Sequence, residues 1–186
     1  MADPTHNSDE LIEVPASDIL AKIKRGEPVE YDHVIINGDL EARNLNLPES
    51  LGKNYLGILV PKLVVASSIK IINSIINGYF DFRFCIFKDA FNIKNTEITG
   101  YVDFHTAEFH WYTNFEGTIF KSHSEFDYCK FCKTAQFADA QWLHWTAWFS
   151  SCHFCEDADF HKCRFIGGAS FSRAQFIGDS DFWSRM

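Results

Sequence analysis

The sequence of 186 residues has no cluster of basic residues. Its 17 lysine and arginine residues are outnumbered by 25 aspartate and glutamate residues, so the formal net charge is −8 at pH 7. Proteins that bind nucleic acid through counterion release need a basic surface that neutralises the phosphates. The composition therefore predicts no direct nucleic-acid binding.

Long uncharged apolar segments are also missing. Residues 1–16 are polar and include Pro4, which predicts a mobile arm rather than a signal peptide. The most apolar stretch, residues 58–78, is interrupted by Lys62 and Lys70, which argues against a membrane-spanning helix. We therefore expect a cytoplasmic protein without a membrane partner, whose six cysteines are free thiols in a reducing compartment.

The motifs of common enzymes are absent. The sequence has no nucleophile elbow, zinc-protease motif, phosphate-binding loop or dinucleotide fingerprint. Six histidines are scattered along the second half of the chain: His105, His110, His123, His144, His153 and His161. None has a nearby serine or cysteine and a carboxylate in a recognisable nucleophile arrangement. We therefore expect no enzymatic activity, no catalytic residue and no cofactor.

What the sequence does contain is a repeat of eleven residues. Aromatic or aliphatic residues recur at alternating gaps of 5 and 6 from Phe82 to Trp142, and after a slip of one residue the pattern resumes from Phe149 to Phe182. The phenylalanines of the predicted core ladder are Phe82, Phe87, Phe104, Phe109, Phe115, Phe120, Phe126, Phe131, Phe137, Phe149, Phe154, Phe160 and Phe165. Such a repeat must be recognised before secondary structure is assigned, because it decides the fold.

An eleven-residue period is also typical of right-handed coiled coils. Here the helix formers leucine, glutamate and lysine are scarce, and phenylalanine, threonine, isoleucine, cysteine and serine dominate. A small residue lies two positions before most aromatic residues, as Ala135 does before Phe137. That spacing puts both on one face of an extended segment, so the pattern predicts short strands rather than helices.

The units AQFAD, ADFHK, CRFIG, ASFSR and AQFIG resemble the pentapeptide-repeat family. The resemblance covers about residues 58–182, in a phenylalanine-centred variant with an extra residue in alternate units. It implies an all-β solenoid, a right-handed quadrilateral β-helix, and is nearly silent about activity. Because four repeats take 22 residues, we expect 22-residue coils whose phenylalanines stack about 4.8 Å apart.

We divide the chain into an N-terminal arm and capping helix (residues 1–33), the β-helix (residues 34–182) and a tail (residues 183–186). The segment SDILAKIKRG predicts one short helix, with Ser17 or Asp18 as its N-cap and Gly26 after its last turn. Solenoids need end caps with a polar outer face, and this helix is the natural candidate.

Two irregularities interrupt the repeat. Residues 48–57 predict an inserted loop, after which aliphatic residues resume the repeat at Val60, Val65, Ile71 and Ile76. The slip of one residue between Trp142 and Phe149 predicts a bulge that exposes part of residues 144–146.

Two C-x-x-C motifs would elsewhere indicate zinc. In this repeat, Cys129 and Cys152 occupy the small inward position, whereas Cys132 and Cys155 should face outward. One inward and one outward pair cannot converge on a tetrahedral ion, so we interpret them as core residues and surface thiols. Two alternatives remain: a zinc site completed by His153 or His161, and a disulfide between Cys132 and Cys155 on neighbouring coils.

Acidic residues also follow the repeat. Asp81, Asp103 and Glu125 are each 22 residues apart and predict a vertical stripe of like charge, and Asp159 and Asp181 predict the same on another column. We group these five residues as the candidate acidic stripe. Neighbouring like charges repel by about 1 kcal/mol in water.

The acidic stripe has two interpretations. It is either a solvated face that keeps the rod soluble, or a mimic of the nucleic-acid backbone. The resemblance supplies the second reading, because some pentapeptide-repeat proteins inhibit DNA gyrase as duplex-shaped acidic rods. Basic residues interrupt the acidity in this chain: Arg83, Lys88, Lys94, Lys130 and Lys162.

The last repeats predict an open C-terminal end formed by Phe171, Phe176, Phe182 and Trp183. Unpaired strand edges and exposed apolar patches favour association. We expect either an end-to-end homodimer through these four residues, or a natural chain that continues beyond residue 186. The dimer is favoured because aromatic residues are enriched at interfaces.

The sequence as a whole predicts a non-enzymatic β-helical module that binds an unidentified protein partner or acts as a scaffold. One alternative is a DNA-mimicking inhibitor of a type II topoisomerase (gyrase). The other is a cytoplasmic structural segment of a longer protein.

Overall fold

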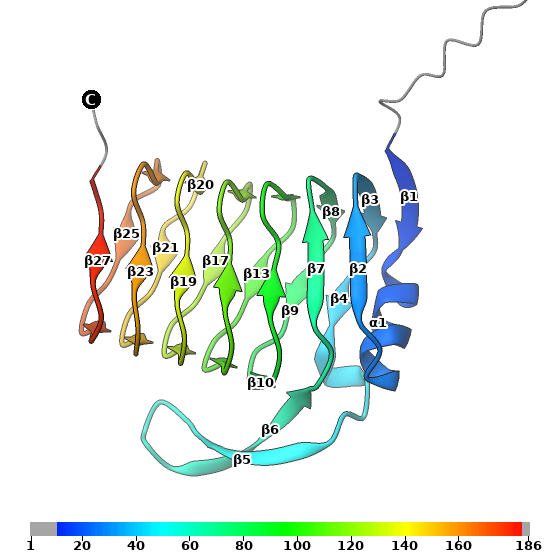
Figure 1. Ribbon diagram of the computed structural model, residues 1–186, viewed down its shortest axis with the longest axis horizontal. Helices are drawn as coiled ribbons and strands as arrows, with labels where there is room; N and C mark the ends of the chain where they lie inside the picture. Colours follow the sequence, from blue (N-terminus) through cyan, green and yellow to red (C-terminus); the bar gives the residue numbers. More distant parts are fainter. Residues whose placement is uncertain (1–10, 184–186) are drawn as a thin grey trace, which may run out of the picture.

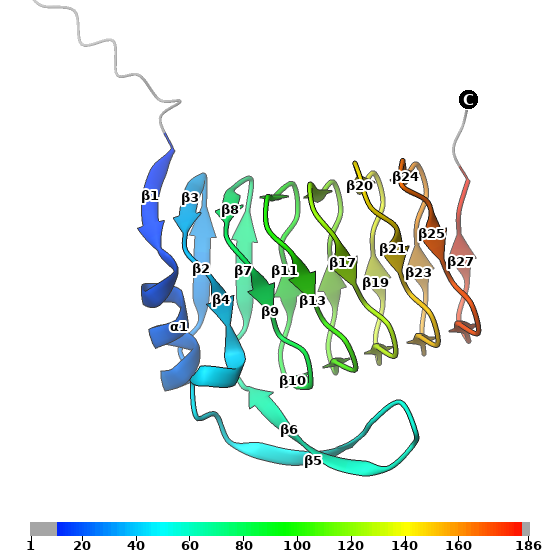
Figure 2. The same ribbon diagram turned by 180° about the vertical axis from the view of Figure 1, so that it is seen from behind.

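The computed structural model describes residues 11–183. They form a β-solenoid of about eight turns, with about 22 residues per coil and one short helix at the N-terminal end (Figures 1 and 2). The predicted all-β solenoid is confirmed. Each coil contributes short strands to four sheets, which are parallel except at one hairpin and form the four sides of a rod.

The strands of each sheet follow one another along the rod. Sheet A contains β1 (Ile12–Pro15), β3 (Val34–Asn37), β8 (Ile75–Asn77), β12 (Glu97–Ile98), β16 (Ile119–Phe120), β20 (Gln141–Trp142) and β24 (Arg164–Phe165). Sheet B contains β2 (Val29–Asp32), β7 (Ile69–Ile72), β11 (Phe91–Asn92), β15 (Thr113–Asn114), β19 (Ala135–Gln136), β23 (Ala158–Asp159) and β27 (Ser180–Asp181). Sheet C contains β4 (Leu40–Glu41), β9 (Phe80–Asp81), β13 (Val102–Asp103), β17 (Ser124–Glu125), β21 (Ala147–Trp148) and β25 (Ala169–Ser170). Sheet D contains β5 (Glu49–Lys53), β6 (Leu59–Val65), β10 (Cys85–Phe87), β14 (Glu108–Phe109), β18 (Lys130–Phe131), β22 (His153–Phe154) and β26 (Gln175–Phe176).

The register between coils explains the regular spacing of the aromatic residues. Phe109 lies opposite Phe87 on one side and Phe131 on the other, each 22 positions away. Ser124 pairs with Ala147, 23 positions away, so one extra residue enters this coil. It is accommodated before Ala147, where the side chain of Trp145 is 60% exposed, which agrees with the predicted bulge.

The interior of the rod is filled by stacked aromatic rings. In the column through Phe109, the ring centroids of Phe109 and Phe131 are 5.0 Å apart and the planes differ by 1°, and Phe131 and Phe154 are 4.9 Å apart. The predicted ladder residues from Phe82 to Phe160 are buried, whereas Phe165 is only partly buried. Burying a phenylalanine stabilises the fold by about 1.5–3 kcal/mol, so the ladder provides much of the hydrophobic stabilisation.

Tight corners recur every eleven residues along much of the rod. Thr106 (φ 58°) and Tyr128 (φ 61°) each lie in the left-handed region, two residues after a ladder phenylalanine. At the second of these corners the N–H of Cys129 donates a hydrogen bond to the carbonyl oxygen of Phe126. A positive φ at the third position of such a turn defines a type II β-turn. These turns lie within the gaps of five residues between ladder residues. The gaps of six residues contain a second kind of corner, which is why the two gap lengths alternate.

The helix α1 (Ala16–Arg25) packs against β1, β2 and β4 at the N-terminal end of the rod (Figure 2). Ile19 and Ile23 are buried there, and Gly26 ends the helix with φ 69°, as predicted. The predicted N-cap is wrong: Pro15 occupies the N-cap position, and no side chain caps the helix. Within residues 11–183, no helix is long and apolar enough to cross a membrane.

The solenoid begins before the helix rather than after it. Residues 12–15, predicted as part of a mobile arm, form β1 and pair with β3. The prediction for residues 1–10 lies outside the described residues. Strand β2 already belongs to sheet B, so the expected boundary between residues 33 and 34 falls within the first coil. The repeat is hidden there because the helix replaces two sides of the coil.

The predicted loop at residues 48–57 is instead part of a β-hairpin. Strands β5 and β6 pair antiparallel, and the hairpin projects from the side of the rod (Figure 1). Val29 pairs with Ile69, which is 40 positions away, whereas Ile69 pairs with Phe91 at the regular 22. The excess of 18 residues is an insertion into one coil. Val60, predicted as a core position, pairs with Gly52 in the hairpin and is only partly buried.

Candidate functional site

The acidic column of sheet C is not an open stripe of charge. Asp81 lies opposite Asp103, and Asp103 lies opposite Glu125, as the 22-residue spacing predicts. However, Asp81 is 5% exposed and Asp103 is 3% exposed, so these carboxylates are not part of a solvated face. The interpretation of this column as a solvated acidic face is therefore wrong for these two residues.

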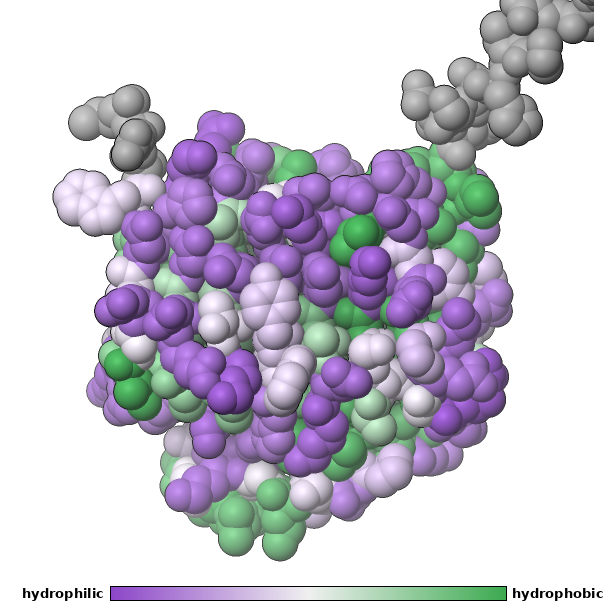
Figure 3. All heavy atoms as spheres, viewed as in Figure 1, coloured by the Kyte–Doolittle hydropathy of each residue, from purple (hydrophilic) through white to green (hydrophobic). Residues whose placement is uncertain are grey.

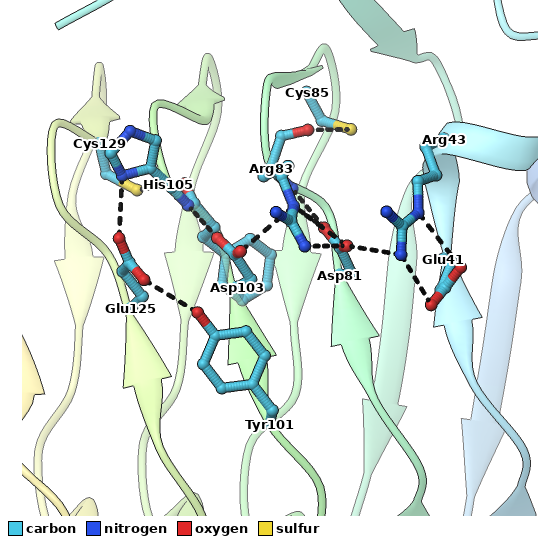
Figure 4. A network of polar contacts seen from close by, with 11 residues as sticks. Glu41, Arg43, Asp81, Arg83, Cys85, Tyr101, Asp103, His105, Glu125 and Cys129 are labelled. Carbon is cyan, nitrogen blue, oxygen red and sulfur yellow. Dashed lines mark hydrogen bonds and ion pairs between the residues drawn. The ribbon is translucent and has the colours of Figure 1, made fainter.

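Arginines lie between the carboxylates of this column (Figure 4). Arg83 places Nη2 2.7 Å from Asp81 Oδ2 and Nε 3.2 Å from Asp103 Oδ2, so one guanidinium bridges two coils. Arg43 lies 3.2 Å from Glu41 and 3.7 Å from Asp81. The hydrogen bond to Asp81 raises the pKa of Arg83. Opposite charges thus alternate along the column, and like-charge repulsion is largely offset.

Glu125 closes the network at its other end. Its carboxylate accepts a hydrogen bond from the Tyr101 hydroxyl at 2.8 Å and lies 3.0 Å from Nδ1 of His105 (Figure 4). The contact with His105 lowers the pKa of Glu125, and the bond from Tyr101 acts in the same direction while burial opposes it. Burial raises the pKa of Asp103, against the backbone N–H of His105 and the charge of Arg83.

The other two residues of the candidate acidic stripe lie in a different sheet. Asp159 and Asp181 pair in sheet B. His161 Nδ1 is 2.7 Å from Asp159 Oδ1, and one ligand atom from each of these three residues lies within 4.8 Å of the others. The structure therefore divides the predicted stripe into an ion-paired column in sheet C and a small carboxylate–histidine group in sheet B.

The four cysteines of the C-x-x-C motifs divide as the repeat predicts. Cys129 and Cys152 are buried, and their thiols donate to the carbonyl oxygens of Phe104 and Phe126 at 3.0 and 2.9 Å. Cys132 and Cys155 are partly exposed, and all four are free thiols. Burial raises the pKa of Cys129 and of Cys132. Buried thiols of this kind act as small apolar residues.

The C-terminal coil exposes its aromatic residues. Phe182 stacks on Phe160 at 5.0 Å but is 45% exposed, and Trp183 is 82% exposed. Phe171 and Phe176 are partly buried. The predicted end-to-end contact through these four residues stays a prediction.

The strongest surface feature is one that the sequence analysis missed. We call residues 49–65 the hairpin arm. It exposes Leu51 (66%), Tyr55 (53%), Leu56 (64%), Ile58 (55%) and Leu59 (58%). Figure 3 shows hydrophobic residues gathered over the hairpin at the bottom of the view. Four aliphatic residues within residues 51–59 are the signal for this surface, but their spacing also fits an inserted loop followed by a continuing core.

A buried lysine fixes the hairpin arm to the rod. Lys62 is 2% exposed, and its Nζ donates to the Thr106 carbonyl oxygen at 2.6 Å and to Glu108 Oε1 at 2.9 Å. Burial opposes ionisation of Glu108, but hydrogen bonds from Lys62 and His110 outweigh it and lower its pKa. A Cβ at Gly52 would lie 2.6 Å from Lys62 Cδ and 2.7 Å from Glu108 Oε1, so a larger residue there would displace the buried Lys62–Glu108 pair.

A pocket of about 490 Å³ lies between the hairpin arm and the coils. The arm contributes Lys53, Asn54 and Tyr55, and the coils contribute Tyr128, Lys130 and His153. The Tyr55 and Tyr128 rings are 5.7 Å apart at a tilt of 52°. The turn of the arm is held by Asn54, whose Oδ1 accepts hydrogen bonds from the N–H groups of Leu56 and Ile58.

Comparison with protein families gives one match, to the family described as pentapeptide repeats (9 copies), over residues 143–184. These coils are pentapeptide repeats. The match confirms the family that the sequence resembles, and the same coil geometry extends from the matched segment through the rest of the rod. No curated protein and no solved structure matches the chain. Pentapeptide-repeat solenoids are generally non-enzymatic structural modules.

Proposed function

We propose that this pentapeptide-repeat chain is a non-enzymatic protein-interaction module that holds its partner on the hairpin arm. The observation that carries the proposal is the exposed apolar surface of the arm. Of the 15 large hydrophobic residues exposed among residues 11–183, five lie within residues 51–59. Contiguous exposed apolar patches typically mark interaction sites.

One face of the hairpin carries much of this surface. In an antiparallel pair, directly opposite residues lie on the same face. Leu51 lies opposite Pro61, and Leu59 lies two residues before Pro61, so these three share the face away from buried Gly52 and Lys62. Lys53 is the last residue of β5 and lines the pocket where the two strands turn. A partner that covered Leu51 and Leu59 would remove apolar area from water at about 25 cal/mol per Å².

The hairpin arm also offers backbone hydrogen bonds. Strand β5 is the last strand of sheet D and pairs only with β6 among the described strands. An open edge of this kind can accept an added strand, with backbone bonds supplying affinity and flanking side chains supplying specificity. The rod supports this arm rigidly, because Lys62 ties it to Thr106 and Glu108.

A capture experiment with a matched control tests the proposal. The wild-type chain and the variant Leu51→Ser/Leu59→Ser are compared as baits in extract from the source cell. The control is Ile166→Ser/Ile177→Ser, which changes two aliphatic residues that are 60% and 68% exposed elsewhere on the rod. We expect a partner that is retained by the wild type and the control and lost by the hairpin variant.

Two outcomes would contradict the proposal. Every specifically captured protein could bind the hairpin variant as well as the wild type, or the control could lose the same proteins as the hairpin variant. The alternative of gyrase inhibition through an acidic rod is less favoured by the geometry, because Arg83 and Arg43 neutralise part of the column in sheet C. It stays a hypothesis, which a supercoiling assay with added protein would test.

A further inference from the structure

The pocket beside the hairpin arm lies next to the exposed Leu56 and Ile58 of its turn, which we call the apolar tip. Tyr55 and Gly57 line the pocket, and the residues next to them in the chain, Leu56 and Ile58, are exposed at the tip. A segment that lies on the tip therefore passes the mouth of the pocket. The volume of about 490 Å³ accommodates one or two side chains of such a segment, and is within the range of ligand pockets.

Two lysines at this pocket lack acidic partners. Lys53 and Lys130 line it and form no ion pair with any residue of the described chain. Lys62, in contrast, is paired with Glu108, so its charge is already offset. In a chain with a net charge of −8, two unpaired lysines beside one pocket are a local positive site.

The remaining walls suit a side chain carried by a peptide. The Tyr55 and Tyr128 rings form an apolar wall, and Ser151 adds a hydroxyl group that can donate a hydrogen bond. An ammonium group interacts with a carboxylate through short, charge-assisted hydrogen bonds. The lysines of the pocket thus complement the charge of an anion, and the tyrosine rings offer a surface for the methylene groups that carry the anion.

We propose that this pocket receives the carboxylate of an aspartate or glutamate from the partner segment that lies on the hairpin arm, with Lys53 and Lys130 as its ligands. This inference rests on the proposed function, and it adds the chemistry of the partner: an acidic residue flanked by apolar residues. The apolar neighbours contact Leu56 and Ile58, and the carboxylate enters the pocket.

A peptide titration tests this directly on the full chain. The probe is an acetylated, amidated tetrapeptide, leucine-glutamate-glutamate-leucine, followed by the ring-proton NMR signals of His153. These signals are assigned by comparison with His153→Gln. We expect shifts that saturate with peptide, that weaken as salt is raised, and that fall at least tenfold in affinity in Lys53→Gln/Lys130→Gln. The control Lys24→Gln/Lys162→Gln removes the same charge at exposed lysines that do not line the pocket, and it should bind as the wild type does.

Three outcomes would overturn the inference. The first is equal binding of the peptide in which glutamine replaces both glutamates, since apolar contact alone would then suffice. The second is saturation of the same signals by inorganic phosphate at the same concentration, which would indicate a site for small anions. The third is unchanged binding in Lys53→Gln/Lys130→Gln.

The partner found by capture separates this inference from the proposed function. If Leu51→Ser/Leu59→Ser loses the partner but Lys53→Gln/Lys130→Gln retains it with unchanged affinity, the hairpin arm is the interface and the acidic anchor is wrong. If neither variant loses any partner, both proposals fail. If both variants lose it and the control variants do not, both are supported.

Discussion

Single residues in sheet C show how a repeat converts a column of like charge into an ion-paired network. The 22-residue spacing was sufficient to predict that Asp81, Asp103 and Glu125 stack. It could not predict the burial of Asp81 and Asp103 or the contacts of Glu125. These depend on Arg83 and His105, whose side chains fold back across the corner. The repeat period determines which residues share a column. The contacts of long side chains depend on the three-dimensional structure, which the period does not specify.

Removing the central cation should therefore destabilise the rod. Arg83→Ala leaves the carboxylates of Asp81 and Asp103 without their shared partner. Both are nearly buried, but Arg83 is 42% exposed, so we expect a loss of about 2–3 kcal/mol, below the cost of breaking a fully buried pair. Urea denaturation at pH 7 measures the loss. Arg164→Ala, at an exposed arginine, should change the free energy of unfolding by under about 0.5 kcal/mol, and equal effects of both variants would refute the role of the network.

The loss of folding stability at acid pH should depend on Glu125. Its folded-state pKa is lowered by His105 and Tyr101, so its contribution is present above the unfolded pKa of about 4.3 and is lost as the pH falls through the folded pKa. Unfolding is measured between pH 6 and pH 3 for the wild type and for Glu125→Gln. We expect the variant to lose less stability over this range. The same pH dependence in both proteins would contradict the assignment.

At the scale of the structural elements, the corners carry a local strain that the repeat imposes. A non-glycine residue in the left-handed region costs roughly 1–2 kcal/mol, and Lys162 adopts φ 55° at an exposed corner. Lys162→Gly should therefore raise the free energy of unfolding by up to about 1 kcal/mol. Lys130→Gly, in strand β18, should lower it by about 0.5–1 kcal/mol. Thermal and urea melts of the two variants should differ in sign, and destabilisation by both would contradict the corner geometry.

Prediction from the sequence succeeded for the elements that repeat and for helix α1, whose apolar spacing and final Gly26 are local signals, and it failed for β1 and the hairpin arm. The stacked columns and the bulge near Trp145 follow from counting residues between phenylalanines. Strand β1 and the hairpin arm each occur once, so no period identifies them. The aliphatic run around Val60 also agreed with the repeat by chance, because strands in a hairpin and strands in a coil favour the same residue types.

For the whole molecule, the exposed aromatic end predicts concentration-dependent association. Phe182 and Trp183 are 45% and 82% exposed beside the partly buried rings of Phe171 and Phe176. Sedimentation of the wild type should show a dimer at high concentration, and Phe182→Asp/Trp183→Ser should sediment as a monomer. A wild-type chain that stays monomeric at every concentration would leave the end-to-end contact without support.

The insertion of the hairpin arm into an otherwise regular rod allows the arm to be removed whole. Leu63 pairs with Cys85, 22 positions away, and Glu41 pairs with Asp81, 40 positions away. Deleting the 18 residues from Pro48 to Val65 removes the whole arm, joins Leu47 to Ala66 and restores the regular spacing in this coil. The buried residues Leu45 and Leu47 then occupy the positions that correspond to Cys85 and Phe87. Asn44 then occupies the position that corresponds to Phe84, which has φ 55°, and asparagine tolerates this conformation well.

Partner binding by this shortened chain tests the central claim most directly. Circular dichroism and a cooperative urea transition first establish that its coils remain folded, and Leu51→Ser/Leu59→Ser provides the same test within the full-length rod. We predict that both proteins fold and that both lose the partner captured by the wild type. A folded, shortened rod that still binds that partner with wild-type affinity would contradict the assignment of the hairpin arm as the interaction surface.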